Sequence, residues 1–232
     1  MAGYIGNYPT AVPLTSADIQ DGTIGIADLS ATGTKDSTTF LRGDNTFQAV
    51  SSDYVLLATV DASSSASVSF DGYFSATYKN YQVILSDVFP TATNGFLRKR
   101  FRRSNADITT SNYTDGGGGS YQYTGVGSGF KYFGSANGVA YIRCGDEDGQ
   151  RGTSNYAHHE ITTIYSPLST NTYKVLTSQI GLTQRTDASN YNYTIVGTSG
   201  MLYDNTNALS GISFYMSTGN IASGTFKLYG IK

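Results

Sequence analysis

From Ser51 onward, the chain consists of short runs in which apolar and polar residues alternate. Such alternation is typical of β-strands that bury one face, and Tyr81–Leu85 and Gly224–Ile231 are examples. Pro90 and the pair Asn94–Gly95 are turn formers between runs. No window of about eleven or more residues keeps the 3.6-residue period of an amphipathic helix. The pattern therefore predicts an all-β protein without a long helix.

About ten such runs follow one another in residues 51–232. They are Val55–Val60, Ser67–Phe70, Tyr81–Leu85, Gly95–Arg98, Val139–Arg143, His159–Tyr165, Tyr173–Leu182, Tyr191–Val196, Ile212–Met216 and Gly224–Ile231. Strands at this spacing are typical of two antiparallel sheets packed face to face. We expect a jelly-roll-like two-sheet sandwich, large enough to bury a core without metals or disulfides. Val55–Val60 is apolar almost throughout and is expected to be a buried strand.

The composition favours a protein built for contact rather than chemistry. Charged residues make up 14% of the 232, against about 25% in a typical domain, whereas there are 27 Gly and 19 Tyr. The net charge of −2 lacks the broad basic footprint of a nucleic-acid binder. No stretch approaches the roughly 18 apolar residues of a membrane span. The single Cys144 excludes an intramolecular disulfide framework.

Residues 1–50 have a different character, being polar and loosely repetitive. Ala17–Ile19 recurs as Ala27–Leu29, and few residues are large and apolar. A segment this poor in apolar residues cannot build its own core, so its order must come from a neighbouring surface. We expect an extended N-terminal arm, with a disordered tail as the alternative. Residues 1–9 also lack the charged and apolar regions of a secretory signal, so we expect assembly in a host cytoplasm and release by lysis.

Four stretches carry a resemblance to a known class of proteins. Ser37–Phe47, Ser-Thr-Thr-Phe-Leu-Arg-Gly-Asp-Asn-Thr-Phe, resembles the junction STTFLRGDGTW of bacteriophage tail-fibre and related appendage proteins. Asn45 replaces a Gly and Phe47 a Trp, but Asn tolerates the left-handed backbone and Phe is still an aromatic anchor. Residues 3–9 resemble the N-terminal anchors of marine-phage fibre proteins. Residues 165–179 and 217–232 resemble a β-sandwich domain of phage virion proteins.

The resemblance implies a virion protein that the arm anchors to the particle. The expected anchoring and oligomerisation residues are the large apolar side chains of the arm: Tyr4, Ile5, Tyr8, Ile19, Ile24, Leu29, Phe40, Leu41 and Phe47. A thin arm without its own core becomes stable when several copies wrap together, and together with the resemblance this predicts a homotrimer. The expected partners are other virion proteins of the tail, head or capsid. Nucleic acid and membrane insertion are not expected.

Arg98–Arg103 holds five of the fifteen positive charges of the chain in six residues. On a strand, Arg98, Arg100 and Arg102 share one face. The planar guanidinium group of arginine forms paired hydrogen bonds with phosphate or carboxylate groups. These three residues are therefore candidate contacts for host surface polysaccharide or a neighbouring subunit. The alternatives are an ion-pair network within or between subunits and a charged edge strand that resists aggregation.

Residues 115–138 are rich in glycine and aromatic residues. Tyr with small residues is typical of adaptable recognition loops, so Tyr121, Tyr123 and Tyr132 are candidate receptor or subunit contacts. A mobile hairpin without a partner is the alternative.

No pattern predicts catalysis, a metal or a cofactor. His158 and His159 face opposite sides of a regular strand, which leaves only His158 and Glu160 on one face, too few for a zinc site. Asp146–Asp148 misses the calcium-loop spacing and is expected to be an acidic turn. Scattered Ser, Asp and His form no nucleophile elbow. We therefore expect no enzyme.

Three functions fit these observations. The first is a non-enzymatic bacteriophage virion structural protein, a fibre or appendage subunit whose residues 1–50 attach to tail or head and whose residues 51–232 form the outer domain. The second is a host-receptor module that binds polysaccharide. The third is a capsid decoration protein.

Overall fold

A computed structural model describes residues 15, 17, 19–28, 30–123, 127–145, 157–185 and 192–232. The chain divides into two compact units, Met1–Ser52 and Asp53–Lys232. The division lies close to the boundary expected from the sequence after residue 50. No α-helix occurs among the described residues of either unit.

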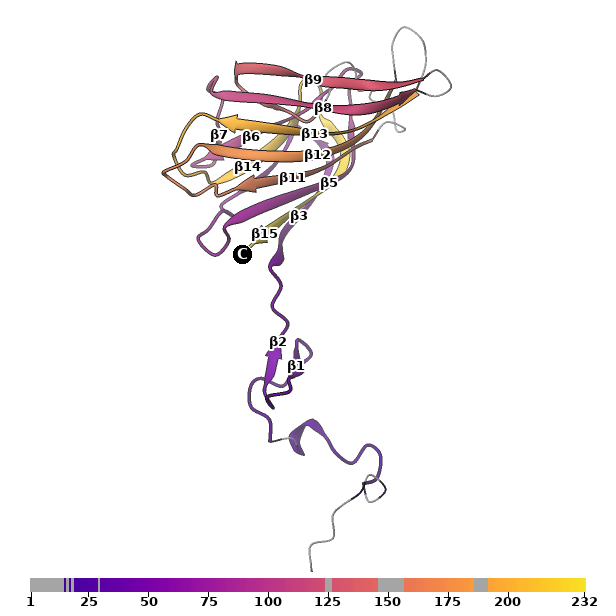
Figure 1. Cartoon of the computed structure of the whole chain (residues 1–232), viewed down its shortest axis with the longest axis vertical. Coiled ribbons are helices and arrows are strands. Elements are labelled where there is room, and N and C mark those ends of the chain that lie inside the picture. Colours follow the sequence, from indigo (N-terminus) through magenta and orange to yellow (C-terminus); the bar gives the residue numbers. More distant parts are fainter. Residues whose placement is uncertain are drawn as a thin grey trace, which may run out of the picture. The chain divides into compact units, whose positions relative to one another are not determined.

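The larger unit contains two antiparallel sheets (Figure 1). The eight-stranded sheet has the order β3 (Tyr54–Ser65), β15 (Ile221–Ile231), β5 (Asn80–Pro90), β11 (His158–Tyr165), β12 (Lys174–Arg185), β13 (Asn192–Tyr203), β8 (Tyr113–Tyr123) and β9 (Gly127–Val139). The five-stranded sheet has the order β10 (Ile142–Arg143), β6 (Leu97–Arg103), β14 (Gly211–Met216) and β4 (Ser67–Asp71), with β7 (Ala106–Asp107) paired to β6.

Aromatic side chains join the two sheets in the core. The ring of Phe214 on β14 lies 5.5 Å from that of Phe226 on β15, and Phe101 on β6 meets Tyr113 on β8 at 6.3 Å. All four side chains are fully buried. The two-sheet sandwich predicted from the alternating pattern is therefore confirmed. A jelly roll has eight strands in two Greek keys, whereas these sheets hold eight and five, so that finer description stays a prediction.

The central strands bury one face and expose the other. On β11, buried and more exposed residues alternate from His158 to Tyr165, as expected for a strand whose inner side chains enter the core. The outward side chains of β5, β11, β12, β13, β8 and β9 form one surface, here called the outer face.

Val55–Val60 forms a strand, as expected, but the expectation that this strand is buried is wrong. This run belongs to β3, the edge strand of the large sheet, and Leu56 is 51% exposed. An edge strand has a sheet neighbour on one side only, so apolar side chains directed outward stay in contact with solvent.

The smaller unit contains a short antiparallel pair, β1 (Thr39–Leu41) and β2 (Phe47–Ala49), preceded by the 3₁₀ turn η2 (Ile26–Asp28). Ala31 is its one buried apolar residue among those described. Such a unit has almost no hydrophobic core of its own, as expected for the arm.

Candidate functional site

Polar contacts, rather than apolar packing, hold the arm unit in its local fold. The Oγ1 and backbone N–H of Thr46 donate to Asp44 Oδ1 at 2.7 and 3.2 Å, and Thr38 donates to Asp36 Oδ1 in the same way at 2.6 and 2.8 Å. These threonine hydrogen bonds hold the pKa of both carboxyl groups below the ordinary value. Asn45 has φ 62°, which is the left-handed backbone expected of it.

The large apolar side chains of the arm are left at its surface. Ile19 is 43% exposed, Ile24 58%, Phe40 47% and Leu41 43%. Phe47 is half-buried, and Lys35 Nζ lies 5.8 Å from the centre of its ring. Four of these nine expected contact residues lie outside the described residues: Tyr4, Ile5, Tyr8 and Leu29.

On β6, Leu97, Lys99 and Phe101 are buried, and Arg98, Arg100 and Arg102 share the opposite face, as expected. Each of the three arginines is engaged within the chain. The guanidinium of Arg98 lies 3.8 Å from the ring centre of Tyr141, and that of Arg100 lies 4.4 Å from Tyr215; Arg102 forms ion pairs with Asp71 and Asp107. This arrangement matches the ion-pair alternative, and a role in contact with a ligand stays a prediction.

Residues 115–123 and 127–138 do not form a loop, so the expectation of a recognition loop is wrong, whereas two paired antiparallel strands agree with the hairpin of the alternative. These residues lie in strands β8 and β9, which pair from Tyr113–Val139 to Tyr123–Gly127. Tyr121 is half-buried and packs against a small apolar cluster, whereas Tyr132 is 79% exposed. Tyr123 lies on β8 opposite Gly127, and its side chain is outside the described part of the structure.

A fully buried polar cluster lies between the two sheets. Lys99 Nζ of β6 forms an ion pair with Glu160 of β11 and also donates to Thr162 Oγ1 at 3.0 Å and Ser178 Oγ at 2.7 Å. His158 Nε2 lies 3.1 Å from Glu160 Oε2. His158 and Glu160 therefore do share a face, as expected.

The charges in this cluster stabilise one another. Burial alone would lower the pKa of Lys99, but the neighbouring Glu160 carboxylate holds it above the ordinary value. Burial alone would raise the pKa of Glu160, but Lys99 and His158 hold it well below the ordinary value. Burial raises the pKa of the neighbouring Cys144 thiol. These pKa shifts keep the Cys144 thiol neutral, the Lys99 amine protonated and the Glu160 carboxyl ionised. Groups that keep one protonation state favour a structural role over proton transfer.

Among the described residues, no group of three or more His, Cys, Asp or Glu side chains is placed to hold a metal ion. Asp146–Asp148, the expected acidic turn, lies outside the described residues. Nor does the described part of the chain contain a helix of the length and apolar character needed to cross a membrane.

The outer face brings together residues that are distant in sequence. Strand register aligns Gln82, Thr163, Thr177, Gly200 and Gly116 in one row across five strands. The next row is Ile84, Ile161, Gln179, Thr198 and Gly118, and a third is His159, Gly181, Val196 and Ser120. Hydroxyl and amide groups therefore alternate with apolar side chains and glycines over this surface.

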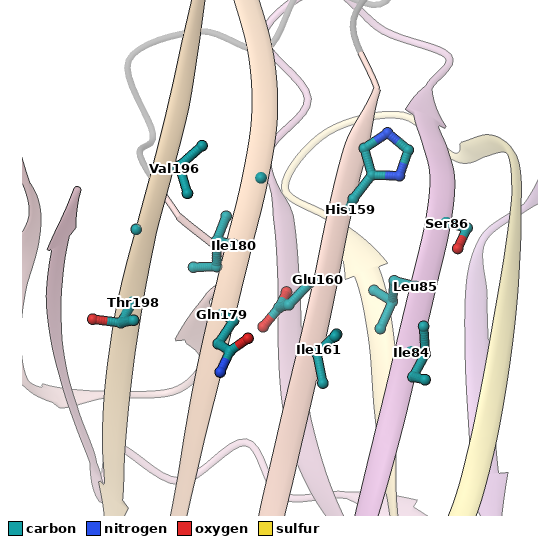
Figure 2. A pocket seen from close by; sticks show the side chains of 12 residues that line it. Ile84, Leu85, Ser86, His159, Glu160, Ile161, Gln179, Ile180, Val196 and Thr198 are labelled. Carbon is teal, nitrogen blue, oxygen red and sulfur yellow. The ribbon is translucent and has the colours of Figure 1, made fainter. Parts of the chain in front are cut away.

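Two hollows occupy this face. One of about 540 Å³ is lined by residues of β5, β11, β12 and β13, among them Ile84, His159 and Val196 (Figure 2). A second of about 740 Å³ extends over Gln82, Tyr165, Gly116 and Gly200 toward β8. Both are lined by Ile161, Gln179 and Thr198, so they adjoin.

Nothing in the alternating pattern of single strands indicates this surface. One other signal in the sequence points to it. Two strands carry uncharged polar residues two positions apart, Thr163 with Tyr165 and Thr177 with Gln179, and residues spaced in this way lie on the same side of a strand. Among the expected contact residues whose side chains the structure describes, Tyr132 alone belongs to a row of this face, because Gly118 pairs with it.

Comparison of the chain with protein-family models, with curated proteins and with solved structures finds no match.

Proposed function

We propose that the chain is a non-enzymatic structural subunit of a bacteriophage virion, a fibre or appendage protein attached to the tail or head through its N-terminal arm. The sandwich forms the outer domain, and three copies of the chain associate through their arms. The resemblance of residues 37–47, 165–179 and 217–232 to phage virion proteins supports the class of protein.

The observation that carries the proposal is the exposure of the arm's apolar side chains. Its local fold is held by Asp–Thr hydrogen bonds and needs no core, yet Ile24, Phe40 and Leu41 are 43–58% exposed. Covering exposed apolar groups with another surface removes them from water and lowers the free energy, so this unit should associate with a partner. Copies of the same arm, or a docking surface on the particle, would supply that cover.

The non-enzymatic part of the proposal is supported by the buried charges. Lys99, Glu160 and His158 are each at most 2% exposed, and Lys99 and His158 are both bonded to Glu160 between the sheets. A catalytic group must come within hydrogen-bond reach of a substrate, and this cluster lies on the inner side of the sheet.

The test is the mass in solution of the full-length protein beside a chain that begins at Ser51. A trimeric full-length protein and a monomeric truncated chain are expected, because the arm holds the exposed apolar residues. Two trimers would place the interface in the sandwich and leave the arm as a docking peptide. Two monomers would contradict the trimeric fibre and favour a capsid decoration protein that is ordered on the particle.

A further inference from the structure

Three glycines leave the backbone of the outer face uncovered by side chains, and this uncovered part is here called the floor of the face. Gly116, Gly181 and Gly200 project outward from the middle of β8, β12 and β13, and a Cβ at any of them would meet nothing within 4 Å. Glycine inside a strand weakens it and is often found where a ligand or another backbone approaches closely. At these three positions no other described part of the chain approaches. The open floor therefore suits something from outside the chain.

The walls around this floor offer uncharged hydrogen-bonding groups. Tyr165 Oη lies 3.1 Å from Thr177 Oγ1, and Gln82 Nε2 donates to Thr163 Oγ1 at 3.3 Å. Hydroxyl and amide groups can each donate and accept further hydrogen bonds. Gln179 stands exposed between the two hollows and is the longest polar side chain that both share.

Apolar surfaces lie beside these polar groups. Ile161 is 38% exposed and Val196 65%. The ring of Phe130 is 60% exposed and lies over Gly118, since a Cβ there would come within 2.6 Å of the ring. A flat ring held against the sheet in this way provides a platform on which a second flat, weakly polar surface can stack.

We propose that the outer face of the large sheet binds a neutral polysaccharide chain. A sugar ring combines an apolar C–H face with a rim of hydroxyl groups, which matches apolar floors and rings flanked by Thr, Gln and Tyr. Neighbouring strands are about 4.8 Å apart, close to the length of one sugar ring, so successive rings of a chain lying across the sheet would rest on successive strands.

The charge of the site selects a neutral glycan. Glu160 borders the first hollow, but its carboxylate is turned inward to Lys99. No Asp, Glu, Lys or Arg projects outward among the described residues that line the two hollows. An anionic polysaccharide would find no lysine or arginine among these residues to offset the loss of its hydration. The imidazole of His159, which lines the first hollow, already lies 3.8 Å from the Asp87 carboxylate.

This inference adds a binding activity to the proposed structural role and does not depend on it. Glycan retention tests the outer face, whereas oligomer mass tests the arm, so either can fail alone. The other occupant to be distinguished is a second copy of the chain lying on the same face.

The experiment applies the labelled full-length protein to an array of neutral and anionic polysaccharides, with affinity for retained glycans measured by calorimetry. The test variant is Gly200→Tyr, which fills the floor without meeting any atom of the chain within 4 Å of its Cβ. The control is Thr59→Tyr, at an exposed position of β3 that lines neither hollow. We expect retention on neutral glycans, weakened about tenfold or more by Gly200→Tyr and unchanged by Thr59→Tyr.

Three results would overturn the inference. They are retention on no neutral glycan, retention on anionic glycans alone, and equal affinity of the Gly200→Tyr variant and the parent protein. A change of oligomer mass in Gly200→Tyr, without glycan retention by the parent, would assign this face to contact between copies. Gln179→Ala gives an independent check, because it removes hydrogen-bonding groups and adds no bulk; unchanged affinity would also contradict the proposed contacts.

Discussion

At the scale of single residues, the ion pair between Lys99 and Glu160 places two opposite charges in the core of the sandwich. Removing both charges from water carries a desolvation penalty that their attraction offsets only if the remaining polar atoms are also bonded. Here Thr162 and Ser178 bond to Lys99, and His158 bonds to Glu160. The pair connects the two sheets, because Lys99 lies on β6 and Glu160 on β11.

Replacing Lys99 with Met should lower the free energy of unfolding by about 3–5 kcal/mol, because the Glu160 charge would stay buried without its partner. Urea denaturation followed by circular dichroism measures the change. The double variant Lys99→Met with Glu160→Leu should recover much of the loss, since it leaves neither charge buried.

The matched control for this prediction is Arg98→Met, the same substitution one residue earlier on the outward face. Arg98 contacts the ring of Tyr141, so a loss of less than about 1 kcal/mol is expected. If the double variant were no more stable than Lys99→Met, the two charges would not be coupled.

The same pair predicts how stability depends on pH. The pKa of Glu160 lies below its ordinary value of 4.5, so its contribution is complete above that pH and is lost as the pH falls toward the lowered value. The pKa of Lys99 lies above its ordinary value of 10.5, so its contribution is complete below that pH and is lost as the pH rises further.

The stability advantage of the parent protein over Glu160→Gln should therefore shrink as the pH falls below about 4.5 and stay level near neutral pH. Urea midpoints of the two proteins, compared over a series of acidic buffers, measure it. Taking the difference removes the titration of the other carboxyl groups. Parallel pH profiles would show that Glu160 does not titrate as the structure requires.

At the scale of elements, β8 shows how one sequence feature can mislead. Four consecutive glycines favour a flexible loop, yet residues 116–119 are central in a strand pair with β13. A Cβ on Gly117 would come within 2.5 Å of Thr198 O, and one on Gly119 within 2.5 Å of Val196 O. The glycines serve close contact between backbones, which a single sequence does not distinguish from flexibility.

Gly117→Ala should consequently destabilise the protein by about 1–3 kcal/mol, because the strands must separate to admit the methyl group. Gly116→Ala is the matched control. Its Cβ meets nothing within 4 Å, so the change should be neutral or slightly stabilising. Thermal unfolding of both variants measures the contrast, and similar melting temperatures would contradict the close packing of β8 on β13.

The alternating pattern was sufficient to predict the sandwich and the facing of β6, where Leu97, Lys99 and Phe101 turn inward. It was not sufficient to predict the outer face. Gln82 and Thr163 become neighbours only through the pairing of β5 with β11, and Thr177 and Gly200 through that of β12 with β13. Strand order and register depend on contacts between distant segments, which local periodicity does not contain.

At the scale of the whole molecule, the two units differ in where they place their apolar side chains. The sandwich buries aromatic residues such as Phe214 and Phe226 in its core and exposes hydroxyl groups, amide groups and the rings of Phe130 and Tyr132. The arm orders its backbone with polar contacts and keeps Phe40 and Leu41 at its surface. A unit ordered in this way can meet a partner without first refolding, so less conformational entropy is lost on association.

The double variant Phe40→Ser with Leu41→Ser should therefore weaken association of the full-length chain while leaving the sandwich intact. Both side chains are nearly half exposed in the single chain, so their loss costs little local stability, but it removes apolar area that association would bury. Mass photometry over a dilution series should show a shift from trimer to monomer, with an unchanged melting temperature for the sandwich.

Thr38→Ser with Thr39→Ser is the matched control, because these changes keep the hydroxyl groups that bond to Asp36 and to Thr34 O. It should associate as the parent protein does. A trimer that persisted in Phe40→Ser with Leu41→Ser would place the interface elsewhere, and a trimer lost in the control as well would show that the backbone order of the arm, rather than its apolar surface, drives association.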